Sequence, residues 1–118
     1  MTPGAHTPEE LESLLEDAFV TGDAEGVFDM FQEGAVLVAG VEPREARGVH
    51  AIRRLVEVLL DRNETYVAEP SRVVQARDTA LVLGEAGLNV VRRGGGGAWQ
   101  YAIALLSSHQ AAPDEEER

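Results

Sequence analysis

The sequence has no cysteine and no long apolar run, and each absence excludes a class of structure. Without cysteine the chain forms no disulfide and no metal site built on thiolates. No run of about 18 apolar residues is present, so no segment is expected to span a membrane. The N-terminus has no basic stretch followed by an apolar one, so we expect no secretory signal, and a cytoplasmic location is the default.

Basic residues are also few, and all of them are arginine. The 10 arginines face 21 aspartates and glutamates, which gives a formal net charge of −11 at pH 7. Because nucleic-acid binding needs a basic surface that neutralises phosphates, this charge argues against a nucleic-acid partner. The three histidines, His6, His50 and His109, share no metal-type spacing, and we expect no metal and no cofactor.

The remaining composition is typical of one globular domain. The chain has 118 residues, of which 44% are hydrophobic and 26% charged. At this length a protein buries roughly 65% of the surface that it exposes when unfolded, so a core can form without covalent staples. We expect a single domain over residues 1–109. Residues 110–118 end in DEEER without an apolar anchor, and we expect them to form a disordered acidic tail.

Capping signals and apolar spacing predict three helices in the first half of the chain. The first is expected to begin at an N-cap, Thr7, with Pro8 in its first turn, and to end at Gly22. A shorter helix is expected from Asp23 to Phe31, and a third from Val49 to Asp61. The apolar residues of the first helix share one face: Leu11, Leu14, Leu15, Ala18 and Phe19.

Beyond the helices the apolar residues lack helical spacing and predict strands. Val, Leu, Tyr and Ala are frequent there, with turn signals at Arg77-Asp78 and at the four glycines 94–97. The expected strands are Val36–Ala39, Thr65–Ala76, Thr79–Arg92 and Ala98–Ser108. Whether Gly84 to Gly87 forms a tight hairpin or a bulge in one long strand stays open. Helices first and an antiparallel sheet afterwards predict an α+β layer architecture.

This order of elements, together with short stretches of sequence, resembles the nuclear-transport-factor-2-like superfamily, which includes ketosteroid isomerases and SnoaL-type polyketide cyclases. The stretches are TPEELESLLEDAF, TGDAEGVFDMF, EGAVLVAG, RGVHAIRRLV, DTALVLG and VVRRGGGGAWQYAIALLS. The resemblance implies a cone-shaped, curved antiparallel sheet packed around three N-terminal helices, a cystatin-like α+β roll. It also implies an apolar pocket inside the cone and a homodimer formed through the sheet.

One departure from the superfamily concerns the sheet. Members usually have an extra strand pair between the stretches matching DTALVLG and NVVRRG, whereas here only Glu85 to Leu88 separate them. We therefore expect a smaller sheet and a more open cone.

The residues that isomerase chemistry needs are missing from the positions that the resemblance assigns to them. That chemistry uses a carboxylate base and two acidic hydrogen-bond donors around a developing enolate oxygen. The resemblance places the phenol on Leu15, the base on Ala39 and the protonated acid on Asn89. Leu15 and Ala39 have no polar group, and an amide is a weak acid, so the familiar isomerase mechanism is rejected.

Other polar residues remain candidates for proton transfer. His50, in the first turn of the third helix, is a general base if a carboxylate such as Glu42 orients it. The structural alternative is a surface His50, with Glu42 and Glu45 paired to nearby arginines. Unbroken alternation from Thr79 places Leu81, Leu83, Glu85, Asn89 and Val91 on one face, so Glu85 points into the cone beside Asn89 unless a bulge turns it outward.

In the last strand, alternation places Trp99, Tyr101, Ile103 and Leu105 on one side. Aromatic residues there line a pocket or pack in the core or at a dimer interface, and Tyr66 has the same alternatives. The ligand-lining candidates are Leu15, Phe19, Ala39, Leu55, Tyr66, Trp99 and Tyr101.

The sequence therefore predicts a homodimeric protein that binds a small hydrophobic or aromatic molecule in the cone. One alternative is a proton-transferring isomerase or cyclase acting on a polyketide-like or steroid-like compound, with Glu85, Asn89 and His50 as candidate catalytic residues. Another is a structural or partner-binding module that works through the face of the sheet.

Overall fold

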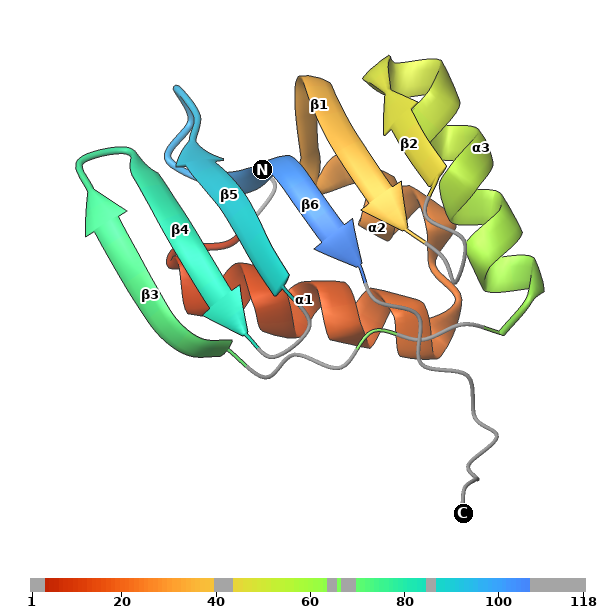
Figure 1. Cartoon of the computed structure of the whole chain (residues 1–118), viewed down its shortest axis with the longest axis horizontal. Helices are drawn as coiled ribbons and strands as arrows, with labels where there is room; N and C mark the ends of the chain where they lie inside the picture. The colour runs from red at the N-terminus through yellow and green to blue at the C-terminus, as the bar shows by residue number, and fades with distance from the viewer. Residues whose placement is uncertain (1–3, 40–43, 64–65, 67–69, 85–86, 107–118) are drawn as a thin grey trace.

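The computed structural model describes residues 4–39, 44–63, 66, 70–84 and 87–106. Within these residues it contains three helices, α1 (Pro8–Thr21), α2 (Ala24–Asp29) and α3 (Gly48–Asp61). The strands are β1 (Phe31–Ala39), β2 (Arg44–Arg47), β3 (Pro70–Ala76), β4 (Thr79–Gly84), β5 (Gly87–Arg93) and β6 (Trp99–Leu106). They form a six-stranded curved sheet in the order β2-β1-β6-β5-β4-β3 (Figure 1). The expected α+β architecture is confirmed, and the expected tail, 110–118, lies outside the described residues.

The first helix begins and ends where its capping residues predict. The Thr7 hydroxyl accepts a hydrogen bond from the backbone N–H of Glu10 at 3.0 Å, and Pro8 occupies the first turn. Gly22 ends the helix in the left-handed conformation, with φ of 71°. Asp23 then caps α2 by accepting from the N–H of Gly26 at 3.0 Å.

The second helix is shorter than predicted, and the strand after it is longer. α2 ends at Asp29, and β1 begins at Phe31 rather than at Val36. The reason is the pairing with β6: Phe31 lies opposite Tyr101 in the sheet, and their ring centroids are 5.5 Å apart. This β1–β6 pairing is parallel, whereas the other four pairings of the sheet are antiparallel.

A strand that the sequence did not indicate lies before α3. Residues 44–47, which lie between the predicted strand Val36–Ala39 and the predicted helix from Val49 to Asp61, form β2 and pair with β1. Only Ala46 of this strand is buried, so the segment REAR has too little apolar character to show strand periodicity.

The segment between Gly84 and Gly87 is a hairpin rather than a bulge. β4 and β5 pair antiparallel from Thr79 opposite Arg92 to Gly84 opposite Gly87. The turn reverses the chain, so the single alternation expected from Thr79 to Arg92 is wrong. Asn89 and Val91 share the buried face with Ala80 and Val82, while Leu81 is 37% exposed on the outer face. Glu85 lies outside the described residues.

A bulge also breaks the alternation of the last strand. Val90 pairs with Ile103 but Val91 pairs with Tyr101, which leaves Ala102 as an extra residue in β6. Trp99 and Tyr101 are both buried on the inner face of the sheet, whereas Ile103 is 43% exposed on the opposite face. The placement of Ile103 and Leu105 on the same side as the aromatic pair was therefore wrong.

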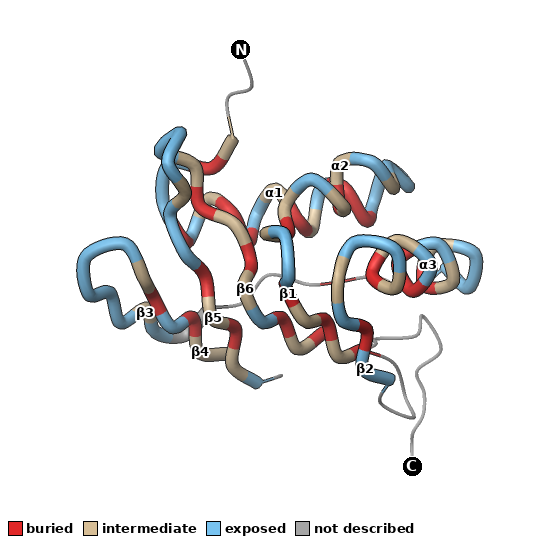
Figure 2. The backbone as a smooth tube through the Cα atoms, turned by 90° about the horizontal axis from the view of Figure 1, so that it is seen from above, coloured by how far each residue is buried: buried red, intermediate tan, exposed pale blue. Residues whose placement is uncertain are grey.

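The helices cover one face of the sheet, and Figure 2 shows them on the same side of the strands. α1 contacts β3, β4 and β6, while α3 contacts β1 and β2. The core lies between these layers, and the outer face of the sheet has no covering layer in the described part of the chain. No described helix is long and apolar enough to cross a membrane.

Candidate functional site

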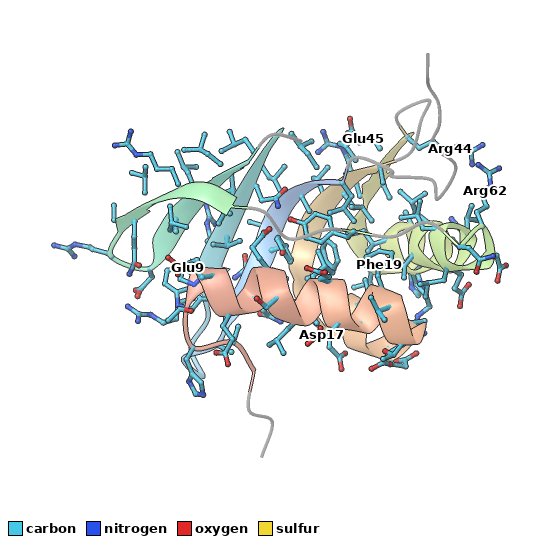
Figure 3. All side chains as sticks on the ribbon, turned by 90° about the horizontal axis from the view of Figure 1, so that it is seen from below. Glu9, Asp17, Phe19, Arg44, Glu45 and Arg62 are labelled. Carbon is cyan, nitrogen blue, oxygen red and sulfur yellow. The ribbon has the colours of Figure 1, made fainter. Side chains whose placement is uncertain are left out.

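A buried carboxylate, Glu12, lies between α1 and the concave face of the sheet. Glu12 is 2% exposed, which is unusual for an acidic residue. It is buried because it lies on the helix face that also carries Leu15 and Phe19. Figure 3 shows Phe19 directed from α1 toward the sheet and Asp17 directed away from it. Of the described residues with charged or amide side chains, Glu12 and Asn89 are the buried ones.

Three neutral donors surround the Glu12 carboxylate, and each comes from a different part of the chain. The hydroxyl of Tyr66, between α3 and β3, donates to Oε1. The hydroxyl of Tyr101, on β6, donates to Oε2 at 2.8 Å, and Nδ2 of Asn89, on β5, donates to the same oxygen at 3.0 Å. We call Glu12, Tyr66, Asn89 and Tyr101 the carboxylate cluster.

The sheet fixes the orientation of the Asn89 amide. Its Oδ1 accepts a hydrogen bond from the backbone N–H of Leu105 at 2.7 Å, which directs Nδ2 toward Glu12. The amide thus links the β5–β6 pairing to the carboxylate. A buried charged group is tolerated only when polar partners replace the water that it loses, and here donors supply that replacement.

The cluster keeps both tyrosines protonated. Burial raises the pKa of Tyr66, and the hydrogen bond to Glu12 and the charge of that carboxylate raise it further. Burial also raises the pKa of Tyr101 well above 10.0, and the negative charge of Glu12 adds to the shift. Both phenols therefore act as neutral hydrogen-bond donors throughout the neutral pH range.

A groove of about 710 Å³ lies between the N-terminal part of α1, α2 and the β5–β6 hairpin, and no residue of the cluster lines it. Leu11, which precedes Glu12 in the sequence, and Trp99, two residues before Tyr101, line it, and both are buried. The rest of the lining combines glycines of the hairpin with apolar and polar side chains: Gly4, Ala5, Leu14, Gly26, Asp29, Met30, Gly94, Gly95, Gly96, Ala98 and Gln100.

The structure brings three of the predicted site residues together. Asn89, Tyr66 and Tyr101 meet at Glu12. The other candidate lining residues are buried in the core: Leu15, Phe19, Ala39, Leu55 and Trp99. Trp99 therefore takes its predicted alternative of packing in the core, and it also lines the groove.

The described cluster includes none of the other polar candidates. His50 is exposed in the first turn of α3. Glu42 and Glu85 lie outside the described residues, so their predicted roles beside His50 and Asn89 are not tested. Glu45 forms an ion pair with Arg47, which agrees with the surface alternative for these residues. No group of three potential metal ligands is found among the described residues.

Glu12 is the residue that sequence reasoning missed. The signal was present, because Glu12, Leu15 and Phe19 have the i, i+3, i+7 spacing of one helix face. A glutamate on an otherwise apolar face is unusual and is a candidate functional group. The resemblance directed attention to Leu15, about one turn later.

Comparison with known proteins agrees with this architecture. The sequence model of the SnoaL-like domain matches residues 11–106. No curated protein matches the chain. Among solved structures, a ketosteroid isomerase-like protein from Erwinia carotovora atroseptica superimposes with a TM-score of 0.70 at 21% identity, over 89% of this chain and 94% of that one.

Two further structures share the fold. A putative calcium/calmodulin-dependent protein kinase type II association domain from Thiobacillus denitrificans has a TM-score of 0.74 at 14% identity, over 92% of this chain and 100% of that one. A nuclear-transport-factor-2-like protein with a cystatin-like fold from Novosphingobium aromaticivorans has a TM-score of 0.63 at 18% identity, over 88% of this chain and 80% of that one. At these identities the likeness shows the fold, and the match over residues 11–106 shows the family: the chain belongs to the SnoaL-like domain family.

Proposed function

We propose that the chain binds a small, largely apolar molecule between α1 and the sheet, with the carboxylate cluster as its polar anchor. The observation that supports this most is the burial of Glu12 among donors that come from three different segments. A core built for stability alone gains as much or more from apolar residues at such positions. A retained buried carboxylate is therefore better explained by recognition of a ligand.

The groove supports this proposal by its size and lining. Its volume of about 710 Å³ lies within the range of about 300–1,000 Å³ that is usual for small-molecule sites. Leu11, Leu14, Met30 and Trp99 are the larger apolar residues of its lining, and Leu11 precedes Glu12 on α1. A ligand body in the groove and a polar group directed at Glu12 together make use of both features.

The proposal is tested with a panel of neutral and charged aromatic and alicyclic compounds. Binding is followed through the side-chain amide signals of Asn89 in ¹⁵N-labelled protein, which are readily assigned because the sequence has only one other asparagine, Asn63. We expect some compounds to change the chemical shifts of the Asn89 amide signals. Substitutions that narrow the groove, such as Leu14→Trp, should weaken the binding of these compounds. If no compound moves the Asn89 signals, the proposal is wrong.

Proton transfer by Glu12 is a second candidate function. One carboxylate and two phenols are the groups that enolate chemistry uses, and here they meet in one buried place. In this role the Glu12 carboxylate removes a proton next to a ketone. Each phenol then turns its single O–H from Glu12, which has gained the proton, to the developing oxyanion. The test is exchange of α-protons of cyclic ketones in deuterium oxide. Exchange that persists unchanged in Glu12→Gln contradicts this assignment.

The outer face of the sheet supports the proposal of a homodimer. Register places apolar residues opposite one another across five strands: Val74, Leu81, Val90, Ile103 and Val36. An uncovered sheet face normally carries polar residues, so such a row indicates contact with another surface. We expect a dimer in light scattering and a monomer for Leu81→Glu combined with Ile103→Glu. A monomeric wild type contradicts this proposal without affecting the ligand site.

A further inference from the structure

The groove between α1, α2 and the β5–β6 hairpin has a polar lining of one charge sign. Among its described lining residues, Asp29 on α2 carries a charge, and Gln100 on β6 has a polar, uncharged side chain. No arginine or histidine is among them, and the other lining residues are apolar or glycine. The groove therefore offers one negative charge beside an apolar surface.

The carboxylate of Asp29 is available to a ligand. The residue is exposed, and its side chain forms no hydrogen bond or ion pair with another described residue. Asp29 is also the last residue of α2, where the helix carbonyls carry partial negative charge. An acidic side chain gains nothing from the helix at that position, so helix stability does not explain its presence.

The side chain of Gln100 offers a second acceptor on the same wall of the groove. Its Nε2 donates to the backbone carbonyl of Asp29 at 3.0 Å, which fixes the amide between α2 and the hairpin. Its Oε1 lies on the hairpin side, 3.8 Å from the position that a Cβ on Gly94 would take. This oxygen accepts no hydrogen bond from a described residue. The donor end of the amide is thus used by the protein, and the acceptor end remains for a ligand.

The arginines that interact with this region are already bound to other groups. Arg53 interacts with the charge of Asp29, but its strongest interaction is the hydrogen bond to a glutamate of α2. The guanidinium of Arg93 lies 5.3 Å from the ring of Trp99, and it is paired with an aspartate of the β3–β4 turn. Residues 1–43, which include α1 and α2, contain no arginine and no lysine. The described part of the chain therefore supplies no dedicated counterion for Asp29.

We propose that the groove binds an organic amine in its ammonium form, attached to an apolar body. The ammonium donates to the Asp29 carboxylate, with Oε1 of Gln100 as a further acceptor, because three N–H donors and one positive charge match two acceptors and one negative charge. The apolar body lies along Leu14 and Met30, which are half-buried and line the groove. This inference rests on the proposed binding of a ligand in the groove and adds the charge of that ligand; it needs no contact with Glu12. No covalent step is involved.

The test compares three probes of similar size and different charge: 4-phenylbutylamine, 4-phenylbutanol and 4-phenylbutanoate. Binding at pH 7 is followed through the indole N–H signal of Trp99, the only tryptophan of the chain, and through the side-chain amide signals of Gln100. We expect the amine to bind about three- to tenfold more tightly than the alcohol, since a charged hydrogen bond at an exposed carboxylate contributes less than a buried one. The carboxylate probe is expected to bind most weakly.

Two variants with the same change in charge locate the effect. Asp29→Asn should reduce the ratio of amine to alcohol affinity to about one. Asp61→Asn should leave the ratio unchanged, because Asp61 is likewise an exposed aspartate at the last position of a helix, but on α3 and outside the groove lining. Neither carboxylate has a hydrogen-bond partner among the described residues, so both variants are expected to fold. The comparison of the three probes on the wild type needs no variant.

The outcomes separate this inference from the function on which it rests. If the alcohol binds as tightly as the amine and shifts the Trp99 and Gln100 signals, the inference is overturned while binding in the groove stands. The inference is also overturned if the carboxylate probe binds most tightly, or if the amine preference survives in Asp29→Asn. If none of the three probes binds, the inference is overturned, and the wider panel followed through Asn89 decides the proposed function separately.

Discussion

Replacing Glu12 by leucine should destabilise the protein more than an ordinary surface substitution does. The change keeps the helix propensity and removes the acceptor of three buried donors, those of Tyr66, Asn89 and Tyr101. A buried donor left without a partner costs about 1–3 kcal/mol, so three of them imply a loss of at least about 3 kcal/mol. Urea unfolding followed by circular dichroism measures the change in the free energy of unfolding.

Further variants of the cluster make this prediction specific. Glu12→Gln keeps one acceptor oxygen for Tyr101 and Asn89, while the Tyr66 hydroxyl can accept from the new amide, so the loss should be smaller, about 1–2 kcal/mol. Adding Tyr66→Phe and Tyr101→Phe to Glu12→Leu should recover part of the loss, because two orphaned donors are then removed.

The matched control is Asp17→Leu on the exposed side of α1, expected within about 0.5 kcal/mol of the wild type. A neutral or stabilising Glu12→Leu, or phenylalanine substitutions that add to its loss, would refute the argument that the cluster is desolvated and mutually satisfied.

Three other expectations follow from the structure. The two tyrosines of the chain both belong to the cluster, and their pKa values in the folded protein lie above the usual 10.0, so the stability that they contribute is full below pH 10 and is lost as the pH rises further. Tyrosinate absorbance at 295 nm should therefore rise only together with alkaline unfolding. A stepwise rise while the protein is still folded would contradict this. Thr7→Ala removes the cap of α1 and should cost about 1 kcal/mol in urea unfolding, whereas Thr7→Asp should cost little; equal losses would show that the cap is unimportant. Gly22→Ala places a side chain at a φ of 71° and should destabilise by about 1 kcal/mol, with Gly95→Ala, in open space, as the control that should not.

Local signals made the helices and turns predictable. Thr7, Pro8, Gly22 and Asp23 act through their own backbone neighbours, so their roles are visible in a single sequence. The hairpin at residues 94–97 is of the same kind, with Gly97 at a φ of 90°.

Features that depend on distant pairing were not predictable in the same way. Phe31 joins β1 because β6 offers it a partner, and the extra residue Ala102 appears only when β5 and β6 are in register. Both are consequences of contacts between residues far apart in the chain, which override local preference.

Only part of the site could be predicted, because its residues come together through contacts between distant segments of the chain. The sequence indicated three of the site residues, Tyr66, Asn89 and Tyr101, as polar or aromatic residues in strand-like segments. Their common partner, Glu12, lies on α1. Helical spacing could have marked Glu12 as a buried acid; it could not have shown that three donors from the far half of the chain converge on it.

The claim that Glu12 anchors a ligand is tested most directly by one affinity ratio. For any compound that shifts the Asn89 side-chain signals of the wild type, the dissociation constant is measured again in Glu12→Gln and in Asp17→Asn. The structure predicts a rise of at least about tenfold in Glu12→Gln and no change in Asp17→Asn. Equal affinity for the wild type and Glu12→Gln would contradict the central role assigned to this carboxylate.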